Sequence, residues 1–421
     1  MTAAALPIPA ALGDAAWLKR AATQAVFAAL AAHGHEVRVV GGAVRDGLLG
    51  RSVGDVDLAT PARPEAVMAA AQAAGLKAIP TGLAHGTVTV LAEGHSYEIT
   101  TLREDVASYG RHAKVAFTAD WAADARRRDF TINALYCDAN GALFDPLGGR
   151  PDLAQRRVRF IGDARERIRE DYLRSLRFFR FSAEYGAGEP DRQGLEAAVV
   201  ERAGLACLSG ERVRQELFRL LAAARGPELV RVMLEYGLFS LLLGQAPRPL
   251  LLERTAALEA GLGLTADPLI RLAALVVETR EQAEALRARL RLANDQYALL
   301  ARVESGKGRF AAGMPEAEAK ALLYREGRAA ARWLLLLDWA RSGEPAQHKD
   351  WCQLWALAEQ WQPPLLPVTG EDVLALGVPA GPRVGALMRA LEAWWIAGEF
   401  RADRAGLLAK LRELGAGETP A

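Results

Sequence analysis

The sequence predicts an α+β protein, with a small mixed-sheet part followed by an all-α remainder. Strand-like and helix-like patterns alternate over residues 1–150, whereas almost every later segment repeats its apolar residues at the three-to-four spacing of amphipathic helices. The chain has 421 residues, of which 51% are hydrophobic, so it is long enough for two to four domains with sizeable cores. We therefore expect four parts: a head (1–150), a helical neck (151–224), a helical body (225–362) and a helical tail (363–421).

The elements of the head follow from local patterns. Apolar spacing predicts a helix from Asp14 to His33, and a proline near the first turn supports another from Pro64 to Ala74. Two alternating, β-branched segments separated by a short turn predict a hairpin over 85–91 and 96–102. The remaining elements are expected strands at 36–40 and 52–59, a helix at 43–49, and a turn at Asn140-Gly141.

Helical periodicity dominates the rest of the chain. We expect helices over about 163–185, 191–202, 209–224 and 226–237, several more to about residue 361, and two at 384–395 and 401–414. The sequence Pro363-Pro364 marks the boundary before the tail.

A pair of glycines after the first strand predicts a phosphate-binding turn. Gly41 and Gly42 let backbone N–H groups approach an anion closely, and the helix that starts behind them adds a partial positive charge. Arg45 supplies a forked donor for phosphate oxygens. A Gly-Gly pair by itself is more often an ordinary turn, so this interpretation depends on the residues that follow.

Two aspartates follow on the next expected strand. Asp55 and Asp57 stand two residues apart, so on a strand they point to the same face. Paired carboxylates suit Mg²⁺, and such a pair can hold two metal ions that activate a hydroxyl and stabilise a leaving pyrophosphate. The alternative is a solvated strand end.

Together, the pattern GG-x-x-R-D and the following D-x-D resemble the nucleotidyltransferase signature of the DNA polymerase β superfamily. The flanking residues resemble class II tRNA CCA-adding enzymes and bacterial poly(A) polymerases in particular. No G-x-G-x-x-G or G-K-[ST] motif, which would indicate a Rossmann turn or a P-loop, accompanies the glycines. The resemblance extends over about residues 35–220 and implies a nucleotidyltransferase head.

The resemblance implies a third catalytic carboxylate and a mobile loop. Glu98, on the second strand of the expected hairpin, is the candidate carboxylate beside Asp55 and Asp57, although a surface glutamate is an equal alternative. The polar stretch 103–119 resembles the family's flexible loop, which helps the enzyme switch from C to A addition. An ordinary solvated loop is the alternative.

The segment RRDFTINAL at residues 127–135 matches the family motif in full. Arg128 suits triphosphate oxygens. Asp129 and Asn133 lie four apart, on one face of an expected helix, and can meet ribose hydroxyls. Residues 145–153 resemble the family's hinge between head and neck.

The segment from Glu170 to Arg177 resembles the family motif E-D-x-x-R, which selects the incoming base. Asp171 accepts hydrogen bonds and Arg174 donates them, and their spacing places them on one helix face. Cytosine and adenine both offer an amino donor beside a ring-nitrogen acceptor, whereas uracil and guanine offer the reverse order. One acceptor–donor pair can therefore accept C and A and reject U and G, with Arg177 counted among the nucleotide-binding residues. A surface ion-pair ladder is the alternative.

We expect template-independent addition of C, C and A to tRNA 3′ ends from CTP and ATP, with Mg²⁺ as cofactor. The segment from Ser209 to Leu217 resembles the last family motif and should support the base-reading helix. The alternatives are poly(A) polymerase, partial CC- or A-addition, or a non-catalytic RNA-binding relative. The acceptor arm of tRNA is the expected partner, gripped by neck, body and tail, and no protein partner can be inferred.

Bulk composition neither supports nor excludes an RNA substrate. Net charge is +1, and only seven of the 52 basic residues are lysines. Arginine suits phosphates and base edges, but a GC-rich genome would give the same excess. No apolar run is long enough for a membrane span, the N-terminus lacks the basic region of a secretory signal, and the three cysteines are scattered. We therefore expect a cytoplasmic protein without a membrane partner.

Overall fold

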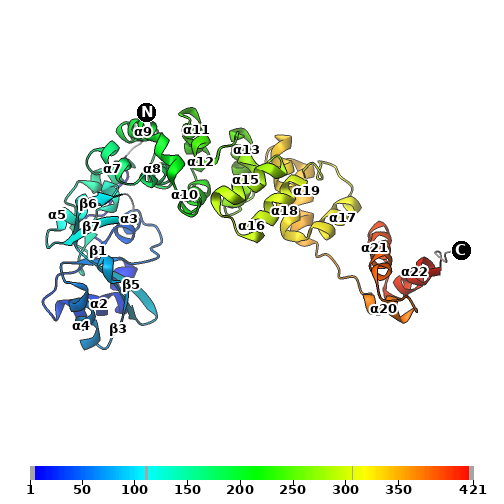
Figure 1. Cartoon of the computed structure of the whole chain (residues 1–421), viewed down its shortest axis with the longest axis horizontal. Coiled ribbons are helices and arrows are strands. Elements are labelled where there is room, and N and C mark those ends of the chain that lie inside the picture. The colour runs from blue at the N-terminus through cyan, green and yellow to red at the C-terminus, as the bar shows by residue number, and fades with distance from the viewer. Residues whose placement is uncertain (1–4, 110–111, 306, 417–421) are drawn as a thin grey trace. The chain divides into compact units, whose positions relative to one another are not determined.

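The computed structural model describes residues 5–109, 112–305 and 307–416, and the chain forms two compact units (Figure 1). The first unit, Met1–Gly244, combines a sheet with helices, and the second, Gln245–Ala421, is helical. The predicted α+β class with an all-α remainder is thereby confirmed. The finer division into head, neck, body and tail stays a prediction.

A seven-stranded mixed sheet forms the base of the first unit. Its strands lie in the order β3 (Lys77–Gly82), β4 (Thr87–Ala92), β5 (His95–Thr101), β2 (Leu58–Thr60), β1 (Arg38–Val40), β8 (Tyr136–Cys137) and β9 (Leu143–Phe144). Only β2 and β5 pair in parallel, with Leu58 opposite Ile99. Val39, Leu58 and Ile99 are fully buried, so the centre of the sheet carries the core.

The predicted hairpins are present. β4 and β5 pair across a two-residue turn in which Glu93 and Gly94 both have positive φ, as the tight hairpin turn requires. β8 and β9 likewise flank the turn at Asn140-Gly141. Strand β3 was not predicted, because Pro80 interrupts its pattern; an edge strand tolerates the missing N–H.

The strand predicted over 52–59 is wrong in extent. Only Leu58–Thr60 is regular, because its partner β1 ends at Val40, where the chain turns away at Gly41. The Asp57 carbonyl still accepts a hydrogen bond from the Val40 N–H at 2.9 Å. Asp55 and Asp57 are exposed and Val56 between them is buried, so the aspartates share one side, although they precede the strand.

Residues 103–119, expected as a loop, largely form a separate two-stranded sheet. β6 (Arg103–Tyr109) and β7 (His112–Phe117) pair antiparallel with a register shift. Gly110 and Arg111, which belong to the predicted loop, lie outside the described residues.

Helices cover the sheet and complete the first unit. They are α1 (Ala16–Lys19), α2 (Ala21–Ala31), α3 (Gly42–Leu48), α4 (Pro64–Ala73), α5 (Trp121–Arg126), α6 (Gly149–Ala154), α7 (Ala164–Glu170), α8 (Leu173–Tyr185), α9 (Arg192–Val200), α10 (Gly210–Ala222), α11 (Gly226–Glu235) and α12 (Leu238–Leu243). Short 3₁₀ turns are η1 (Leu83–His85), η2 (Thr131–Asn133) and η3 (Arg202–Cys207). Two helices predicted as continuous are each broken, at Arg20 and at Asp171, where the backbone becomes extended.

Helices α13 to α22 make up the second unit. They are α13 (Pro249–Gly261), α14 (Pro268–Val276), α15 (Arg280–Leu290), α16 (Asn294–Ser305), α17 (Glu316–Glu326), α18 (Arg328–Ser342), α19 (Lys349–Gln360), α20 (Gly370–Ala375), α21 (Pro382–Ala397) and α22 (Arg404–Ala416). Stacked Trp339 and Trp351 pack α18 on α19, and Leu391, Trp395 and Leu411 join α21 to α22. Across the described residues, no helix is both long and apolar enough to cross a membrane.

Candidate active site

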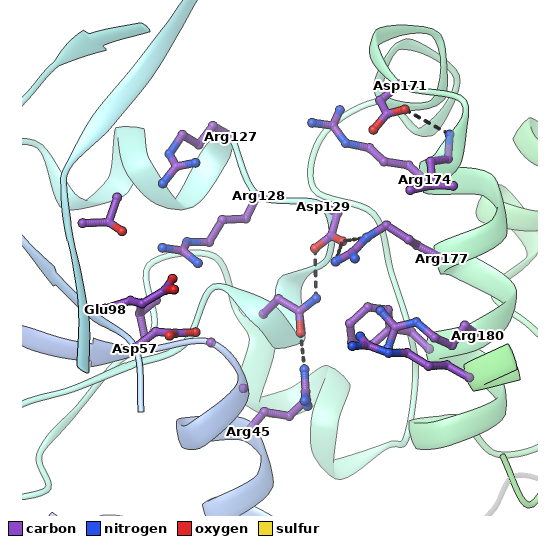
Figure 2. A pocket seen from close by; sticks show the side chains of 18 of the residues that line it. Arg45, Asp57, Glu98, Arg127, Arg128, Asp129, Asp171, Arg174, Arg177 and Arg180 are labelled. Atoms are coloured by element: carbon purple, nitrogen blue, oxygen red, sulfur yellow. Dashed lines mark hydrogen bonds and ion pairs between the residues drawn. The ribbon is translucent and has the colours of Figure 1, made fainter. Parts of the chain in front are cut away.

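A pocket of about 620 Å³ lies within the first unit, lined by the sheet on one side and by α8 and α10 on the other (Figure 2). Its lining includes every predicted site residue except Asp55: Gly41, Gly42, Arg45, Asp57, Glu98, Arg128, Asp129, Asn133, Asp171, Arg174 and Arg177. Sequence reasoning missed several lining residues: Arg103, Arg127, Arg180, Phe181, Arg212 and Arg219. Segments that are far apart in the sequence thus meet at one cavity.

The turn at Gly41 requires glycine. Its φ of 73° lies in the left-handed region, and an added Cβ would lie 3.5 Å from the Asn133 carbonyl and 3.8 Å from Arg128 Nη1. The N–H of Gly41 is donated to the Leu135 carbonyl at 3.0 Å. The turn therefore brings the backbone close to Arg128, but the Gly41 amide itself is not free to bind an anion, contrary to the prediction.

Arg45 organises the site instead of presenting a free fork. Its side chain is buried and donates from Nε to Asp46 at 3.0 Å, from Nη1 to Asn133 Oδ1 at 2.5 Å and from Nη2 to the Tyr185 hydroxyl at 2.7 Å. The guanidinium also lies 4.0 Å from the centre of the Tyr185 ring. Arg45 thus fixes the amide of Asn133. Because Tyr185 is 140 residues away in the chain, no local pattern could have revealed this contact.

Asp129 and Asn133 are together as predicted, but no α-helix joins them. Asn133 lies in η2, and its Nδ2 donates to Asp129 Oδ1 at 2.9 Å. Phe130 pairs with Phe160 across an isolated bridge and packs on the α8 ring of Phe181 at 5.2 Å, so tertiary packing sets this backbone. The expected helix is therefore wrong, while the expected pair of side chains is present.

Asp129 is held ionised although it is buried. Burial favours the neutral acid, but the charge of Arg177 and hydrogen bonds from Asn133, Arg177 and the Phe130 N–H lower the pKa of the carboxyl. Arg177 donates to Asp129 Oδ2 from Nε at 2.8 Å and reaches Glu216 of α10 at 3.2 Å. A charged acceptor next to an amide donor is a suitable arrangement for ribose hydroxyls.

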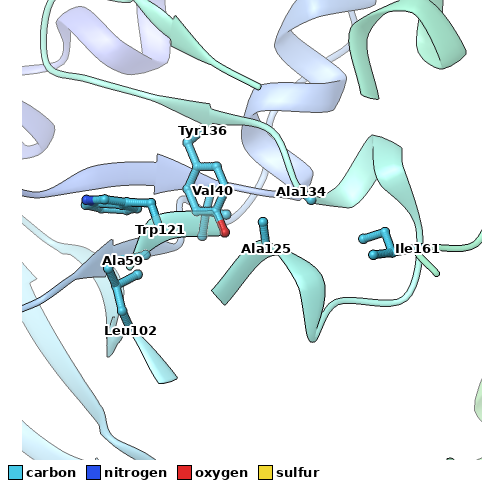
Figure 3. Close-up of a cluster of buried hydrophobic side chains, with 8 residues drawn as sticks. All are labelled: Val40, Ala59, Leu102, Trp121, Ala125, Ala134, Tyr136 and Ile161. Atoms are coloured by element: carbon cyan, nitrogen blue, oxygen red, sulfur yellow. The ribbon is translucent and has the colours of Figure 1, made fainter. Parts of the chain in front are cut away.

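Asp124 holds two arginines beside the pocket. Its side chain is 1% exposed and accepts from Arg127 Nε at 2.7 Å, Arg128 Nη2 at 3.0 Å and the Tyr136 hydroxyl at 2.9 Å. Trp121, Ala125 and Tyr136 belong to one buried hydrophobic cluster (Figure 3), and the Tyr136 hydroxyl links this cluster to Asp124. Asp124 was not predicted, although its spacing of three and four residues before two arginines is the helical ion-pair spacing.

Three carboxylates gather near the end of the sheet. Asp57 and Glu98 line the pocket and lie next to each other, and Glu98 is on β5 beside β2 (Figure 2). The pocket walls partly desolvate the Asp57 carboxylate, although its side chain still reaches solvent, and this desolvation raises its pKa. The negative charges of Glu98 and Asp55 raise the pKa further, and Arg128 opposes the shift. Mutual repulsion between hard oxygen ligands is what a divalent cation would relieve. These side chains therefore fit a metal ion, although no group of three or more potential ligands among the described residues is already arranged around one.

The two residues predicted to read the base lie at a helix break and not on one helix face, so the predicted placement is wrong. Asp171 has extended backbone angles of −154° and 105° between α7 and α8, and its carboxylate accepts two bonds from Arg212 of α10, at 3.1 and 2.6 Å. Arg174 lies in the first turn of α8 and donates through Nη1 to Glu170 and to the Arg167 carbonyl. Both residues still face the same pocket (Figure 2).

Arg212 comes from the segment that was expected only to support this helix. The segment Ser209–Leu217 forms the start of α10, whose Arg212 pairs with Asp171 and whose Glu216 pairs with Arg177 and Arg180. Helix α10 thus supports Asp171 and α8 through these ion pairs, and its Arg212 also lines the cavity.

Comparison with known proteins gives matches over most of the chain. Residues 37–159 match the family model described as the poly A polymerase head domain. The sequence is 35% identical to the mitochondrial CCA tRNA nucleotidyltransferase 1 of Mus musculus, over 90% of this chain and 87% of that protein. It is 42% identical to the CCA-adding enzyme of Geobacillus stearothermophilus over 53% of this chain and 55% of that protein.

Solved structures give the same result. The crystal structure of the Bacillus stearothermophilus CCA-adding enzyme in complex with CTP is similar with a TM-score of 0.72 and 30% identity, covering 94% of this chain and 97% of that chain. A Thermotoga maritima CCA-adding enzyme complexed with tRNA shares the fold, with a TM-score of 0.64 and 20% identity. The predicted resemblance is confirmed: the chain belongs to the family of CCA-adding tRNA nucleotidyltransferases.

Proposed function

We propose that this pocket adds C, C and A to tRNA 3′ ends, using CTP and ATP and no nucleic-acid template. The observation that carries the proposal is the meeting, in one cavity, of the Asp57–Glu98 carboxylates, the Asp129–Asn133 pair and the Asp171–Arg174 pair. These three groups have the chemistry needed for a reacting phosphate, a ribose and a base, respectively.

CCA-adding nucleotidyltransferases depend on a metal ion, and we propose Mg²⁺ here. Asp55 and Asp57 would hold it, with Glu98 beside them, and when bound it would polarise the α-phosphate and stabilise the leaving pyrophosphate. The tRNA 3′-hydroxyl oxygen attacks the α-phosphorus of the nucleotide. The bond from that phosphorus to the bridging oxygen breaks, pyrophosphate leaves, and Glu98 accepts the hydroxyl proton.

The nucleotide would be held by residues around the centre of the pocket. Arg128, fixed by Asp124, meets phosphate oxygens, and Asp129 with Asn133 meets the ribose hydroxyls. Each carboxylate oxygen of Asp171 accepts one hydrogen bond from Arg212 and keeps a second lone pair. Arg174 makes both of its bonds through Nη1, so its Nη2 and Nε can still donate to a ligand. An acceptor and a donor thus remain for C or A.

Incorporation with defined substrates tests the proposal. We would give the purified protein a tRNA that ends before CCA and each nucleoside triphosphate in turn. CTP alone should extend it by two residues, and ATP should add one more only after them. A long run of A would indicate poly(A) polymerase, extension by C alone or A alone would indicate a partial activity, and no incorporation would indicate a non-catalytic RNA-binding relative.

We also propose that the enzyme works in the cytoplasm and grips tRNA through its neck, body and tail. All three cysteines are free, as suits a reducing compartment. The segment from Gly377 to Arg383 joins two tail helices and is largely exposed, which supports an RNA contact there. Cell fractionation tests the location, because recovery only from an organelle would contradict it.

A further inference from the structure

Helix α10 presents two arginines to the pocket, two helical turns apart. Arg212 and Arg219 both line the cavity, and Glu216 lies between them at the spacing of one helix face. Arg212 is bound to Asp171, and Glu216 is bound to arginines of α8. Arg219 therefore lies on the same charged face of α10 as Arg212 and Glu216.

Nine arginines line the pocket, and eight have a bonded partner. The acceptors are Asp46 for Arg45, the His85 carbonyl for Arg103, Asp124 for Arg127 and Arg128, Glu170 for Arg174, Asp129 for Arg177, Glu216 for Arg180 and Asp171 for Arg212. Within the part of the chain that the structure describes, the side chain of Arg219 has no hydrogen-bond or ion-pair partner. It is also exposed, so its charge is available to a ligand.

The neighbour that would ordinarily neutralise Arg219 is already occupied. Glu216 stands three residues earlier on α10, the spacing of a helical ion pair. Its Oε1 accepts from Arg177 at 3.2 Å and its Oε2 from Arg180 at 2.5 Å, and its side chain is only 7% exposed. Both oxygens of Glu216 thus accept from the arginines of α8, and neither is bonded to Arg219.

We propose that Arg219 binds a phosphate group of a substrate. This rests on the proposed function, whose substrates are all polyanions. An exposed guanidinium presents several N–H donors in a planar fork that matches phosphate oxygens. The phosphate belongs either to the triphosphate, and so to the leaving pyrophosphate, or to the RNA chain near its 3′ end.

Equilibrium binding with Arg219→Ala and Arg219→Lys tests the proposal in the full-length protein. The probes are CTP, inorganic pyrophosphate and a tRNA that ends before CCA, the last over a series of salt concentrations. Arg192→Ala is the matched control, because that arginine is 90% exposed on α9 and does not line the pocket. Since Arg219 has no partner to lose, the melting temperature should stay that of the parent.

Two outcomes support the proposal and distinguish the sources. A roughly tenfold loss of affinity for CTP and pyrophosphate in Arg219→Ala, largely restored in Arg219→Lys, assigns the triphosphate. A similar loss for tRNA alone, with the slope of log affinity against log salt reduced by about one, assigns an RNA phosphate. Binding of all three probes within twofold of Arg192→Ala would overturn it. CCA addition by the parent protein is measured alongside, so that failure of the proposed function is seen separately.

Discussion

Asp57, which we propose as a metal ligand, would serve the reaction at some cost to the stability of the fold. Its pKa is raised by partial desolvation in the pocket and by the negative charges of Glu98 and Asp55. A carboxyl whose pKa is higher in the folded than in the unfolded chain contributes stability that is present at low pH and lost as the pH rises through the folded pKa. At neutral pH, without metal, ionised Asp57 therefore works against folding.

We predict that Asp57→Asn abolishes nucleotide incorporation, by at least about a hundredfold, because a metal ligand is lost. In EDTA at pH 7 the same variant should melt at or above the temperature of the parent, and this advantage should shrink as the pH falls towards the pKa of an ordinary aspartate. Incorporation within tenfold of the parent, or a melting temperature several degrees lower, would contradict the assignment. Asp55→Asn should also lose incorporation.

The pKa of Asp124 is shifted in the direction opposite to that of Asp57. Burial would raise the pKa of its carboxyl, but Arg128, Arg127 and the Tyr136 hydroxyl lower it on balance. Its contribution to stability is therefore present at neutral pH and is lost as the pH falls through the folded pKa.

Asp124→Asn should raise the KM for CTP and ATP roughly tenfold, since both arginines lose their charged acceptor. The KM for tRNA should change less, and steady-state kinetics would measure the three KM values. Equal increases for nucleotides and tRNA would indicate that the variant disrupts the fold and not the nucleotide site alone.

The two residues that we propose read the base give a prediction on nucleotide selectivity. Asp171→Ala removes the acceptor for the base amino group, and Arg174→Ala removes a donor to the ring nitrogen. Each loss should cost roughly 1–3 kcal/mol of discrimination, about ten- to a hundredfold, while phosphodiester formation continues. The measurement is the ratio of incorporation efficiencies for CTP and ATP against UTP and GTP. If that ratio stays unchanged in both variants, the base is read elsewhere.

At the scale of helices and strands, sequence patterns predicted the elements well wherever one face is apolar. The same patterns did not predict the breaks within helices or the contacts between segments that are distant in the sequence. The helix expected through Asp171 ends there, and Arg212, 41 residues later, holds that carboxylate. The helix expected around Asp129 is replaced by the packing of Phe130 on Phe160. Motif residues could thus be named from sequence, but the partners that orient them depend on tertiary structure.

The break between α7 and α8 also rests on a close contact with η3. A Cβ at Gly204 would lie 2.0 Å from the Tyr172 ring, so Gly204→Ala must displace the residue next to Asp171. We predict a loss of about 1–3 kcal/mol of stability together with lower selectivity for C and A. Chemical denaturation and the incorporation ratio would measure both. Gly415→Ala is the control, because a Cβ there meets no atom within 4 Å; similar losses in both variants would argue against this contact.

At the scale of the whole molecule, the pocket lies entirely within Met1–Gly244. A truncated protein ending at Gly244 should therefore bind CTP within a few-fold of the full chain. It should bind tRNA far more weakly, and with a smaller salt dependence, if the body and tail supply phosphate contacts as proposed. Calorimetry with CTP and filter binding with tRNA would measure this. Undiminished tRNA affinity would place RNA recognition in the first unit alone.

The pairing of almost every pocket arginine with an acceptor has a consequence for selectivity among cellular anions. A cavity lined by bare cations would attract any polyanion, including inorganic polyphosphate and unrelated RNA, through its field alone. Here most of those charges are neutralised at close range, and the chain as a whole carries a net charge of only +1. An anion must therefore match the positions of the donors to compete for the site, which keeps the cavity available to nucleotides amid a large excess of other phosphates.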